Sequence, residues 1–308
     1  MKRLSAPFAL ALAAPLGAQG QGAFTVVETG RSYARLQDAV LAVGNGTGTI
    51  RIAPGRYAEC AVQEAGRIAF VAAEPGQAIF DGVACEGKAA LVLRGRSAQV
   101  EGLVFQNIRV PDGNGAGIRI ERGDLDVAET MFRDGQCGIL SAADPRGTIR
   151  IEHSTFSGLG RHPDGNGAHS LYVGDYGALI VTASRFERGT GGHYVKSRAA
   201  RIELLDSSFD DSQGRDTNYM IDLPNGATGR IAGNMFVQGT GKENYSILIA
   251  IAAEGAERSS AGLVIENNSA GLAPGFRWRT SFVGTWTNDA LVLRNNDLAP
   301  GIAPLTRH

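Results

Sequence analysis

DLDVAETMF (124–132) and TIRIEHSTF (148–156) share one pattern, in which an alternating strand is followed by a polar turn residue and a phenylalanine. The same pattern recurs in LIVTASRF (179–186), RIELLDSSF (201–209) and RIAGNMF (230–236). Strand-turn-strand units that repeat about every 20 to 30 residues indicate a solenoid, and two to three strands per period favour a parallel β-helix. We expect the repeated phenylalanines to stack in its interior, at positions 105, 132, 156, 186, 209 and 236.

One helix is expected near the N-terminus, before the repeats begin. Ser32 can cap its start, and the Gly-Asn-Gly cluster at 44–46 ends it. Its apolar residues follow the i, i+3, i+4, i+7 spacing of one helical face: Leu36, Ala39, Val40 and Val43. A short amphipathic helix at this place would cover the exposed first layer of a stacked core, as terminal caps do in solenoids.

The predicted helix is followed by TIRIAPGRY (49–57) and then by the repeated units, each with a loop and a G-I-x-I-like strand after its phenylalanine. In this order the chain resembles the right-handed parallel β-helix superfamily of pectate lyases and related carbohydrate-active proteins, over roughly 24–297. The resemblance implies an all-β fold, a right-handed parallel β-helix (solenoid) with a short N-terminal capping α-helix. The superfamily hosts lyases, hydrolases, esterases, epimerases and adhesive proteins, so it implies the fold more than the function.

Length and composition fit one domain built mainly of short strands. The chain has 308 residues, 43% of them hydrophobic, so it can bury a large core. Glycine is frequent, with 42 residues, and aromatic residues make up only 7%, which favours tight turns over long helices. The formal net charge of −1 gives no sign of nucleic acid or a membrane surface as a partner. We expect a monomer with a single domain over 19–308.

The first 18 residues resemble a secretory signal peptide. Lys2 and Arg3 precede the apolar run 8–16, and the small residues Gly17 and Ala18 follow it. We expect removal near Ala18 and a secreted or periplasmic protein; the alternative is a short N-terminal helix that the mature protein keeps. No later segment has the roughly 18 apolar residues needed to span a bilayer, so the mature protein should be soluble.

Export would permit a disulfide, and the chain has three cysteines. Cys60 and Cys85 lie at comparable places in consecutive early units, and consecutive coils run about 4.8 Å apart, within disulfide reach. We therefore predict a Cys60–Cys85 bond. Cys137, beside Gly138 and Ile139, is interpreted as a small buried core residue.

The stretch 169–224 contains three successive units that begin HSLYVG, HYVKSR and YMIDLP. If these units stack, Tyr172, Lys196 and Asp222 lie one above another in a column on one face of the sheet. At the heads of the same strands, a second column of aromatic rings is expected. Its members are His169, His193 and Tyr219. Alternation along the strands predicts these outward side chains: Ser170, Tyr172, Tyr194, Lys196, Arg198 and Asp222.

The first column is polar and varied only in its middle. Long insertions precede the strands of this sheet and would form the walls of a cleft, at 107–116, 158–168, 210–218 and 238–245. Tyrosine, lysine, arginine and aspartate beside two histidines at such a place are typical of a functional site. The alternative is an ion pair between Lys196 and Asp222 that braces the stack. The full column reads Arg119, Leu140, Tyr172, Lys196, Asp222 and Ala250.

These residues fit β-elimination on an acidic polysaccharide or oligosaccharide containing uronate, which is the function we expect. The reaction needs a group that neutralises the sugar carboxylate, a base, and a proton donor for the leaving oxygen. Arg198 suits the first role. Lys196 or His193 suits the second, with the pKa of Lys196 lowered by the nearby arginine and by partial burial, and Tyr172 suits the third. The residues expected to bind substrate are His169, Tyr194, Tyr219, Asp222 and Arg119.

Lys196-Ser197 also resembles the lysine-serine strand of β-helical alginate and chondroitin lyases, where that lysine is the base. Those families bind calcium through a neighbouring cluster of carboxylates and amides, whereas the flanking units here offer only Tyr172 and Asp222. The loops PDGNGAG (111–117) and PDGNGAH (163–169) allow a calcium interpretation, but they lack ligands at the usual spacing with a closing glutamate. We therefore expect neither a metal nor another cofactor.

Two other functions stay open at this point. A glycoside hydrolase needs two carboxyl groups roughly 5 to 10 Å apart, and Asp222 could act with a carboxylate of the following loop. A non-catalytic carbohydrate-binding or surface protein would use exposed aromatic residues instead, although the two tryptophans can also close the last coil. The loop carboxylates are Asp210, Asp211 and Asp216, and the candidate aromatic residues are Tyr172, Tyr194, Trp278 and Trp286.

Overall fold

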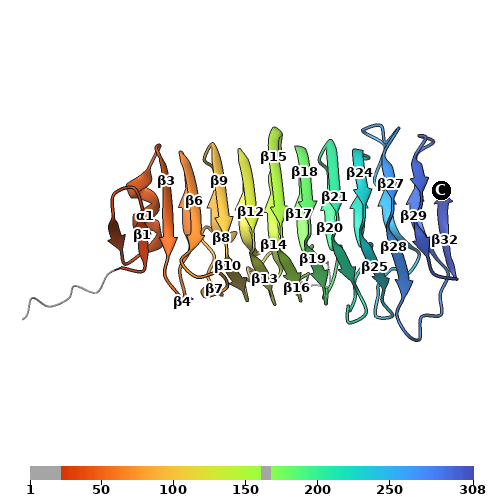
Figure 1. Ribbon diagram of the computed structural model, residues 1–308, viewed down its shortest axis with the longest axis horizontal. Helices are drawn as coiled ribbons and strands as arrows, with labels where there is room; N and C mark the ends of the chain where they lie inside the picture. The colour runs from red at the N-terminus through yellow and green to blue at the C-terminus, as the bar shows by residue number, and fades with distance from the viewer. Residues whose placement is uncertain (1–21, 161–167) are drawn as a thin grey trace, which may run out of the picture.

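Residues 22–160 and 168–308 are described by the structure, a computed structural model. They form a parallel β-helix, in which the chain winds in successive coils and lays its strands into three long sheets (Figure 1). This confirms the predicted solenoid. The predicted signal peptide, 1–18, lies outside the described residues. No helix of the described part is long and apolar enough to cross a membrane.

Sheet A has twelve strands, and all but its first two pair in parallel. Burial alternates along the strands, so that β3, for example, turns Ile50 and Ile52 inward. The strands of sheet A are β1 (Phe24–Val26), β2 (Arg31–Tyr33), β3 (Thr47–Ile52), β6 (Arg67–Ala72), β9 (Ser97–Glu101), β12 (Asp124–Ala128), β15 (Asp144–Glu152), β18 (Tyr176–Thr182), β21 (Arg201–Leu205), β24 (Thr228–Ala232), β27 (Val264–Glu266) and β30 (Val292–Arg294).

Sheet B has ten strands and carries the repeated phenylalanines. From Phe80 to Phe236 the rings stack one on the next, with centroids 4.7 to 5.4 Å apart, which confirms the predicted interior stack. The strands of sheet B are β4 (Gly55–Tyr57), β7 (Ala78–Asp81), β10 (Leu103–Gln106), β13 (Met131–Arg133), β16 (Thr155–Ser157), β19 (Arg185–Glu187), β22 (Ser208–Asp210), β25 (Met235–Gln238), β28 (Ser269–Leu272) and β31 (Asp297–Leu298).

Sheet C also has ten strands and bears the predicted column of Tyr172, Lys196 and Asp222, whereas the residues of the second column lie just before its strands. Its strands are β5 (Ala61–Gln63), β8 (Ala89–Leu93), β11 (Ala116–Ile120), β14 (Cys137–Ser141), β17 (Leu171–Val173), β20 (Val195–Ser197), β23 (Ile221–Leu223), β26 (Ile247–Ile251), β29 (Thr280–Thr285) and β32 (Ile302–Arg307).

The turn from sheet A to sheet B is stabilised by a ladder of buried side chains. Ser207 N–H donates to Asn234 Oδ1 at 3.0 Å, and Asn234 Nδ2 donates to Asn268 Oδ1, also at 3.0 Å. Asn268 Nδ2 continues the ladder to Asn296 Oδ1 at 2.9 Å. Each side chain satisfies backbone or amide groups of the neighbouring coil, which a buried turn requires.

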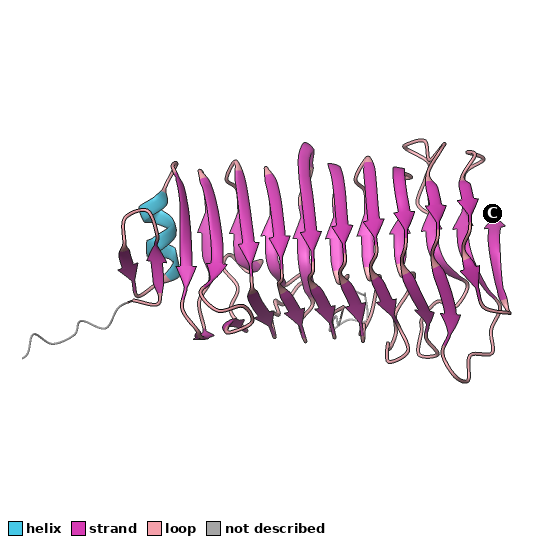
Figure 2. Ribbon diagram, viewed as in Figure 1, coloured by secondary structure: helices cyan, strands magenta, loops and turns pink. Residues whose placement is uncertain are grey.

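The single helix in the described residues, α1 (Leu36–Val43), lies at the N-terminal end of the stack beside β1, β3 and β5 (Figure 2). Its residues Leu36, Ala39 and Val40 are buried. The prediction that Ser32 caps it is wrong, because Ser32 lies in β2 and its hydroxyl contacts that of Thr25 at 2.9 Å. The helix begins after Arg35, which makes no capping bond through its side chain. Its role as a cap of the solenoid stays a prediction.

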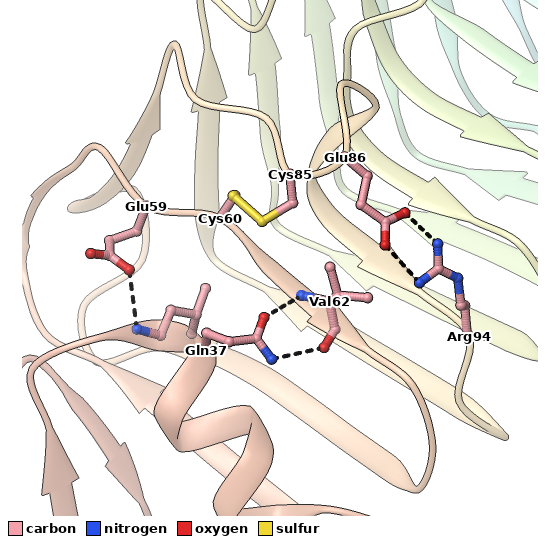
Figure 3. Close-up of a disulfide and its surroundings, with 8 residues drawn as sticks. Gln37, Glu59, Cys60, Val62, Cys85, Glu86 and Arg94 are labelled. Carbon is pink, nitrogen blue, oxygen red and sulfur yellow. Dashed lines mark hydrogen bonds and ion pairs between the residues drawn. A yellow bond between two sulfur atoms is a disulfide. The ribbon is translucent and has the colours of Figure 1, made fainter.

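Cys60 and Cys85 form the predicted disulfide, with their Cα atoms 5.5 Å apart (Figure 3). The bond joins the two segments that precede β5 and β8. In the same view, Gln37 of α1 forms two hydrogen bonds with the backbone of Val62 in β5. Disulfides persist in oxidising compartments, so this bond fits an extracellular location. Cys137 is buried and free, as predicted, in a small apolar cluster on the outer face of sheet C.

Candidate functional site

The register of sheet C places Tyr172, Lys196 and Asp222 on three adjacent strands, directly beside one another. The same column continues to Leu140 and Arg119 on one side. The predicted column is therefore confirmed as geometry. Its side chains face outward, but Lys196 and Asp222 are covered by the turns that follow the strands and are only 7% and 2% exposed.

A carboxylate that no pattern in the sequence indicates completes the cluster. Glu254 lies in the turn after β26, and its two oxygens accept from Lys196 Nζ and from Arg198 Nη2. Lys196 Nζ also donates to Asp222 Oδ2 at 2.9 Å. We call Asp222, Lys196, Glu254 and Arg198 the open network, because Glu254 reaches solvent with 45% of its side chain exposed. The long insertions in the sequence precede the strands of sheet C, whereas Glu254 lies in a turn that follows one.

The electrostatics of the open network overturn one expectation about Lys196. Burial favours the neutral amine, but the carboxylates of Asp222 and Glu254 outweigh it and raise the pKa of Lys196. The prediction of a lowered pKa for Lys196 is therefore wrong. Burial also raises the pKa of Asp222, although Lys196 opposes this. For Glu254, the hydrogen bonds from Lys196 and Arg198 overcome partial burial and lower the pKa.

The second predicted column is present as a stack of three rings, those of His169, His193 and Tyr219, which we call the ring stack. His169 and His193 lie parallel with centroids 4.8 Å apart, and His193 and Tyr219 follow at 5.4 Å. The backbone N–H of His193 donates to His169 Nδ1 at 3.0 Å, so this nitrogen is the acceptor and the neutral ring carries its proton on Nε2. Burial, helped by the charge of Lys196, lowers the pKa of His169 to about 3.

His193 joins the ring stack to the open network. Its Nε2 lies 3.4 Å from Asp222 Oδ2, and its Nδ1 lies 3.3 Å from the carbonyl oxygen of Tyr219. Burial, with the neighbouring His169 and Lys196, holds the pKa of His193 well below its usual value. A neutral His193 carries one ring proton, which it can donate either from Nδ1 to the carbonyl of Tyr219 or from Nε2 to the carboxylate of Asp222.

Tyr172 stands where the open network meets the ring stack. Arg198 Nε donates to the Tyr172 hydroxyl oxygen at 3.1 Å, and Arg198 Nη1 donates to Asn225 Oδ1. The ring of His169 lies edge-on to that of Tyr172, with centroids 5.3 Å apart. Because Arg198 occupies one lone pair of the hydroxyl, the proton and the second lone pair of Tyr172 are left for other partners.

A depression of about 390 Å³ opens on the outer face of sheet C beside Tyr172. Its lining includes Arg119, Leu140, Lys88, Asp112 and Asn114. The Nε atom of Arg119 is buried and has no hydrogen-bond partner within the described residues; its nearest carboxylate oxygen, on Glu121, is 3.8 Å away. The depression thus offers an incompletely paired guanidinium next to a tyrosine hydroxyl.

Tyr194 does not belong to the site, contrary to our expectation. It is 1% exposed, and its hydroxyl donates to Asp211 Oδ1 at 2.7 Å. Tyr194 precedes β20, where the alternation has not yet begun. The residues at the corresponding positions of the next two coils, Met220 before β23 and Leu248 within β26, are buried in the core in the same way. Ser170, at the corresponding place before β17, is buried as well.

The loop carboxylates proposed for hydrolysis lie away from the column. Asp211 pairs with Lys242 at 3.1 Å, and both side chains are completely buried. Thr217 Oγ1 and the hydroxyl of Tyr194 donate to the same carboxylate. We call Asp211, Lys242, Tyr194 and Thr217 the closed network. The other two candidates are not part of it: Asp210 accepts from the N–H of Ser212, and Asp216 is exposed.

The two tryptophans form separate ring contacts. Trp286 stacks on His308, with centroids 4.2 Å apart, and Trp278 stacks on Tyr245 at 3.8 Å. In the first DGNG loop, Asp112 accepts from the backbone N–H of Asn114. The second such loop lies outside the described residues except for its last two positions. Within the described ranges no group of three or more histidine, cysteine, aspartate or glutamate residues could hold a metal ion.

No family model and no curated protein matches the sequence. Among solved structures, the surface protein and adhesin PfbA of Streptococcus pneumoniae aligns with a TM-score of 0.41 and 9% identity, over 88% of this chain and 94% of that one. The A-module of the mannuronan C-5 epimerase AlgE4 of Azotobacter vinelandii aligns with a TM-score of 0.31 and 15% identity, over 87% and 91%. The chain is identified as a parallel β-helix protein by its own three sheets, its phenylalanine stack and the register of its coils. This is the architecture expected from its resemblance to the pectate lyase-like superfamily.

Proposed function

We propose that the protein is an exported polysaccharide lyase that acts as a monomer and cleaves a uronate-containing chain by β-elimination, with Tyr172 transferring the proton. The observation that carries the proposal is the position of the Tyr172 hydroxyl. It borders the depression that contains Arg119, is held by Arg198 Nε at 3.1 Å, and has the ring of His169 against its own ring.

The proposed step balances without a further reactant. The Tyr172 oxygen, in its ionised form held by Arg198, takes the proton from the carbon next to the uronate carboxylate. The electron pair of that C–H bond becomes the new carbon–carbon double bond, and the bond to the leaving glycosidic oxygen breaks. Tyr172 then returns the proton to this oxygen. Arg119 neutralises the carboxylate, and the Nε2–H of neutral His169 can donate to the negative charge that builds on it.

The open network serves this step by holding Arg198. Asp222 fixes Lys196, Lys196 fixes one oxygen of Glu254, and the other oxygen of Glu254 fixes the guanidinium that contacts Tyr172. Lys196 is therefore proposed as a positioning residue, since two carboxylates hold its ammonium and raise its pKa. In this proposal His193 carries its ring proton on Nε2 and donates it to Asp222 Oδ2, which helps to hold that carboxylate in place.

Hydrolysis is the second candidate, because Asp222 and Glu254 are two carboxyl groups whose pKa values are shifted in opposite directions. This is the arrangement in which one carboxylic acid protonates the leaving group while the other stays ionised. Against it, the side chain of Asp222 is only 3% exposed and lies beneath Lys196, so a glycosidic oxygen cannot reach it in this arrangement.

The decisive experiment compares Tyr172→Phe with Tyr176→Phe on a panel of uronate polymers. Tyr176 lies in the following strand of the chain, in sheet A, and contributes its hydroxyl only to the carbonyl of Gly123 at 3.4 Å. We expect the unaltered protein to generate products that absorb in the ultraviolet, also in the presence of a chelator. Tyr172→Phe should lose about 100-fold or more of this activity, and Tyr176→Phe should keep it.

Two results would contradict the proposal. Incorporation of oxygen from labelled water into the new reducing end, without ultraviolet absorbance, would show hydrolysis and redirect attention to Asp222 and Glu254. Binding without cleavage of any polymer in the panel would show a carbohydrate-binding protein.

A further inference from the structure

A cluster of three aromatic rings lies on the loops beside the C-terminal strands of sheet C. Tyr245 and Trp278 stack with their centroids 3.8 Å apart and an angle of 13° between their planes. Phe276 meets Trp278 edge-on at 5.4 Å. Trp278 is 44% exposed, the only large aromatic side chain among the exposed hydrophobic residues of the described ranges. The stack fixes the orientation of the indole, while part of its surface stays open to solvent.

A second depression, of about 410 Å³, adjoins this cluster. Ser246 and Arg279, the chain neighbours of Tyr245 and Trp278, line it together with Ser281 and Thr306. The hydroxyls of Ser281 and Thr306 lie 2.6 Å apart. Its lining therefore combines hydroxyl groups and a guanidinium with aliphatic surface from Ile247 and Ala303, a mixture that fits the hydroxyls, carboxylate and C–H faces of an acidic sugar.

Register places this depression on the same outer face as Tyr172. Thr306 belongs to the column of Lys196 and Asp222, through Ala250 and Gly284. Ser281 lies four strands beyond Tyr172, which corresponds to about 19 Å at the usual spacing of neighbouring strands. A polymer that follows this face from the first depression toward the C-terminal end would thus come to Trp278 and Arg279.

The charges around the second depression favour an acidic chain. Arg277 and Arg279 are both exposed, and neither makes an ion pair or hydrogen bond within the part of the chain that the structure describes. Other surface arginines, such as Arg94 and Arg294, are paired with glutamates. A uronate unit has a negatively charged carboxylate and an apolar ring face. The two unpaired guanidinium groups match the carboxylate, and the exposed indole matches the ring face.

We propose that Trp278, with Tyr245 behind it and Arg279 beside it, forms a distal binding site for a uronate unit of the same polysaccharide chain. The sugar ring lies on the indole, its carboxylate contacts Arg279, and its hydroxyls contact Ser281 and Thr306. The inference rests on the proposed function in taking the ligand to be a uronate chain, but binding at this site does not require cleavage. It gives long chains an advantage over short ones, because only a long chain reaches from Tyr172 to Trp278.

Fluorescence can read this site directly. The chain has two tryptophans, so Trp286→Phe leaves Trp278 as the sole reporter and keeps a ring against His308. We would add Tyr172→Phe to prevent cleavage and titrate with oligogalacturonates and oligomannuronates of increasing length, with cello-oligosaccharides as the neutral probe. Analysis of each sample would show that the ligand stays intact. Long acidic oligosaccharides should change the Trp278 emission, and short or neutral ones should bind at least tenfold more weakly.

Calorimetry on variants completes the test. Trp278→Ala should weaken the binding of long acidic chains about tenfold, which is typical for the loss of an aromatic anchor. Arg279→Ala should weaken it less and reduce its dependence on salt. Met235→Ala, which removes an exposed apolar side chain from sheet B, should leave the dissociation constant unchanged.

Three outcomes would overturn the inference: no binding of any acidic probe, equal dissociation constants for Trp278→Ala and the parent protein, or no dependence on chain length. Failure of the lyase proposal is seen separately, as the absence of ultraviolet-absorbing products from the unaltered protein, and it leaves the binding test readable.

Discussion

Two networks in the molecule each contain a buried pair of a lysine and an aspartate, and they differ in whether their contacts reach solvent. In the closed network, Lys242 and Asp211 are 3.1 Å apart, both completely buried, and the remaining contacts of the carboxylate come from Tyr194 and Thr217. In the open network, Lys196 and Asp222 are 2.9 Å apart, but the chain of contacts continues outward through Glu254.

The comparison teaches that a buried ion pair alone does not mark a site. The closed network uses its hydrogen-bonding groups within the protein and joins the loop after β22 to the loop after β25, which is a structural role. The open network runs from a buried carboxylate to a tyrosine hydroxyl beside a depression. We therefore assign the proposed function to the open network, because it reaches a surface where a ligand can bind.

The largest effect is expected from Lys242→Met, which removes the charge but keeps most of the volume. Asp211 would then be a buried carboxylate without a counter-ion, a change that typically costs about 3 to 5 kcal/mol. The free energy of unfolding, measured by urea denaturation, should fall by this amount, while the activity of the protein that stays folded should not change. Adding Asp211→Asn should restore much of the lost stability. A loss below about 1 kcal/mol would show that the closed network is not a structural brace.

Alternation and repetition explain which parts of this comparison the sequence could predict. The period-two pattern around Tyr172, Lys196 and Asp222 is local, so it determines which side chains share a face, and the coil repeat then determines the column. The same reasoning predicts the phenylalanine stack and the pairing of Cys60 with Cys85. None of these features depends on the path of a long loop.

The features that the sequence did not predict depend on such paths. Glu254 comes 58 residues after Lys196 along the chain, and no periodicity indicates that its turn folds back over the column. Without Glu254, Lys196 looked like a base with a lowered pKa, whereas the second carboxylate raises it. Strand alternation would place Tyr194 on the outer face only if the strand included it, but β20 begins one residue later, at Val195.

The same substitution in the open network should have a smaller effect on stability and a larger one on activity. Lys196→Met leaves Asp222, whose pKa is already raised by burial and which can become protonated, and Glu254, which reaches solvent. We expect a loss of about 1 to 2 kcal/mol in the free energy of unfolding. Activity should fall about tenfold or more, because Glu254 loses one of the two cations that fix it.

Lys196→Arg provides the matched control for this prediction. It keeps the positive charge between the two carboxylates, so a positioning role predicts partial recovery of kcat. A direct role of the amine as the base predicts no recovery, because a guanidinium stays protonated in proteins. Equal losses of stability for Lys196→Met and Lys242→Met would remove the distinction between the two networks.

The smallest effect concerns pH and tests the histidine rings beside the open network. The pKa of His169 is lowered to about 3 in the folded protein, against about 6.5 in an unfolded chain. Below pH 6.5 the unfolded chain therefore binds a proton that the folded protein does not, so stability decreases as the pH falls from 6.5 toward 3. In His169→Gln this contribution disappears. Urea denaturation at pH 7.5 and 5.5 should show that the free energy of unfolding falls less in His169→Gln than in the unaltered protein, by about 1 kcal/mol. Identical losses in the two proteins would mean that His169 is protonated at pH 5.5 in the folded state.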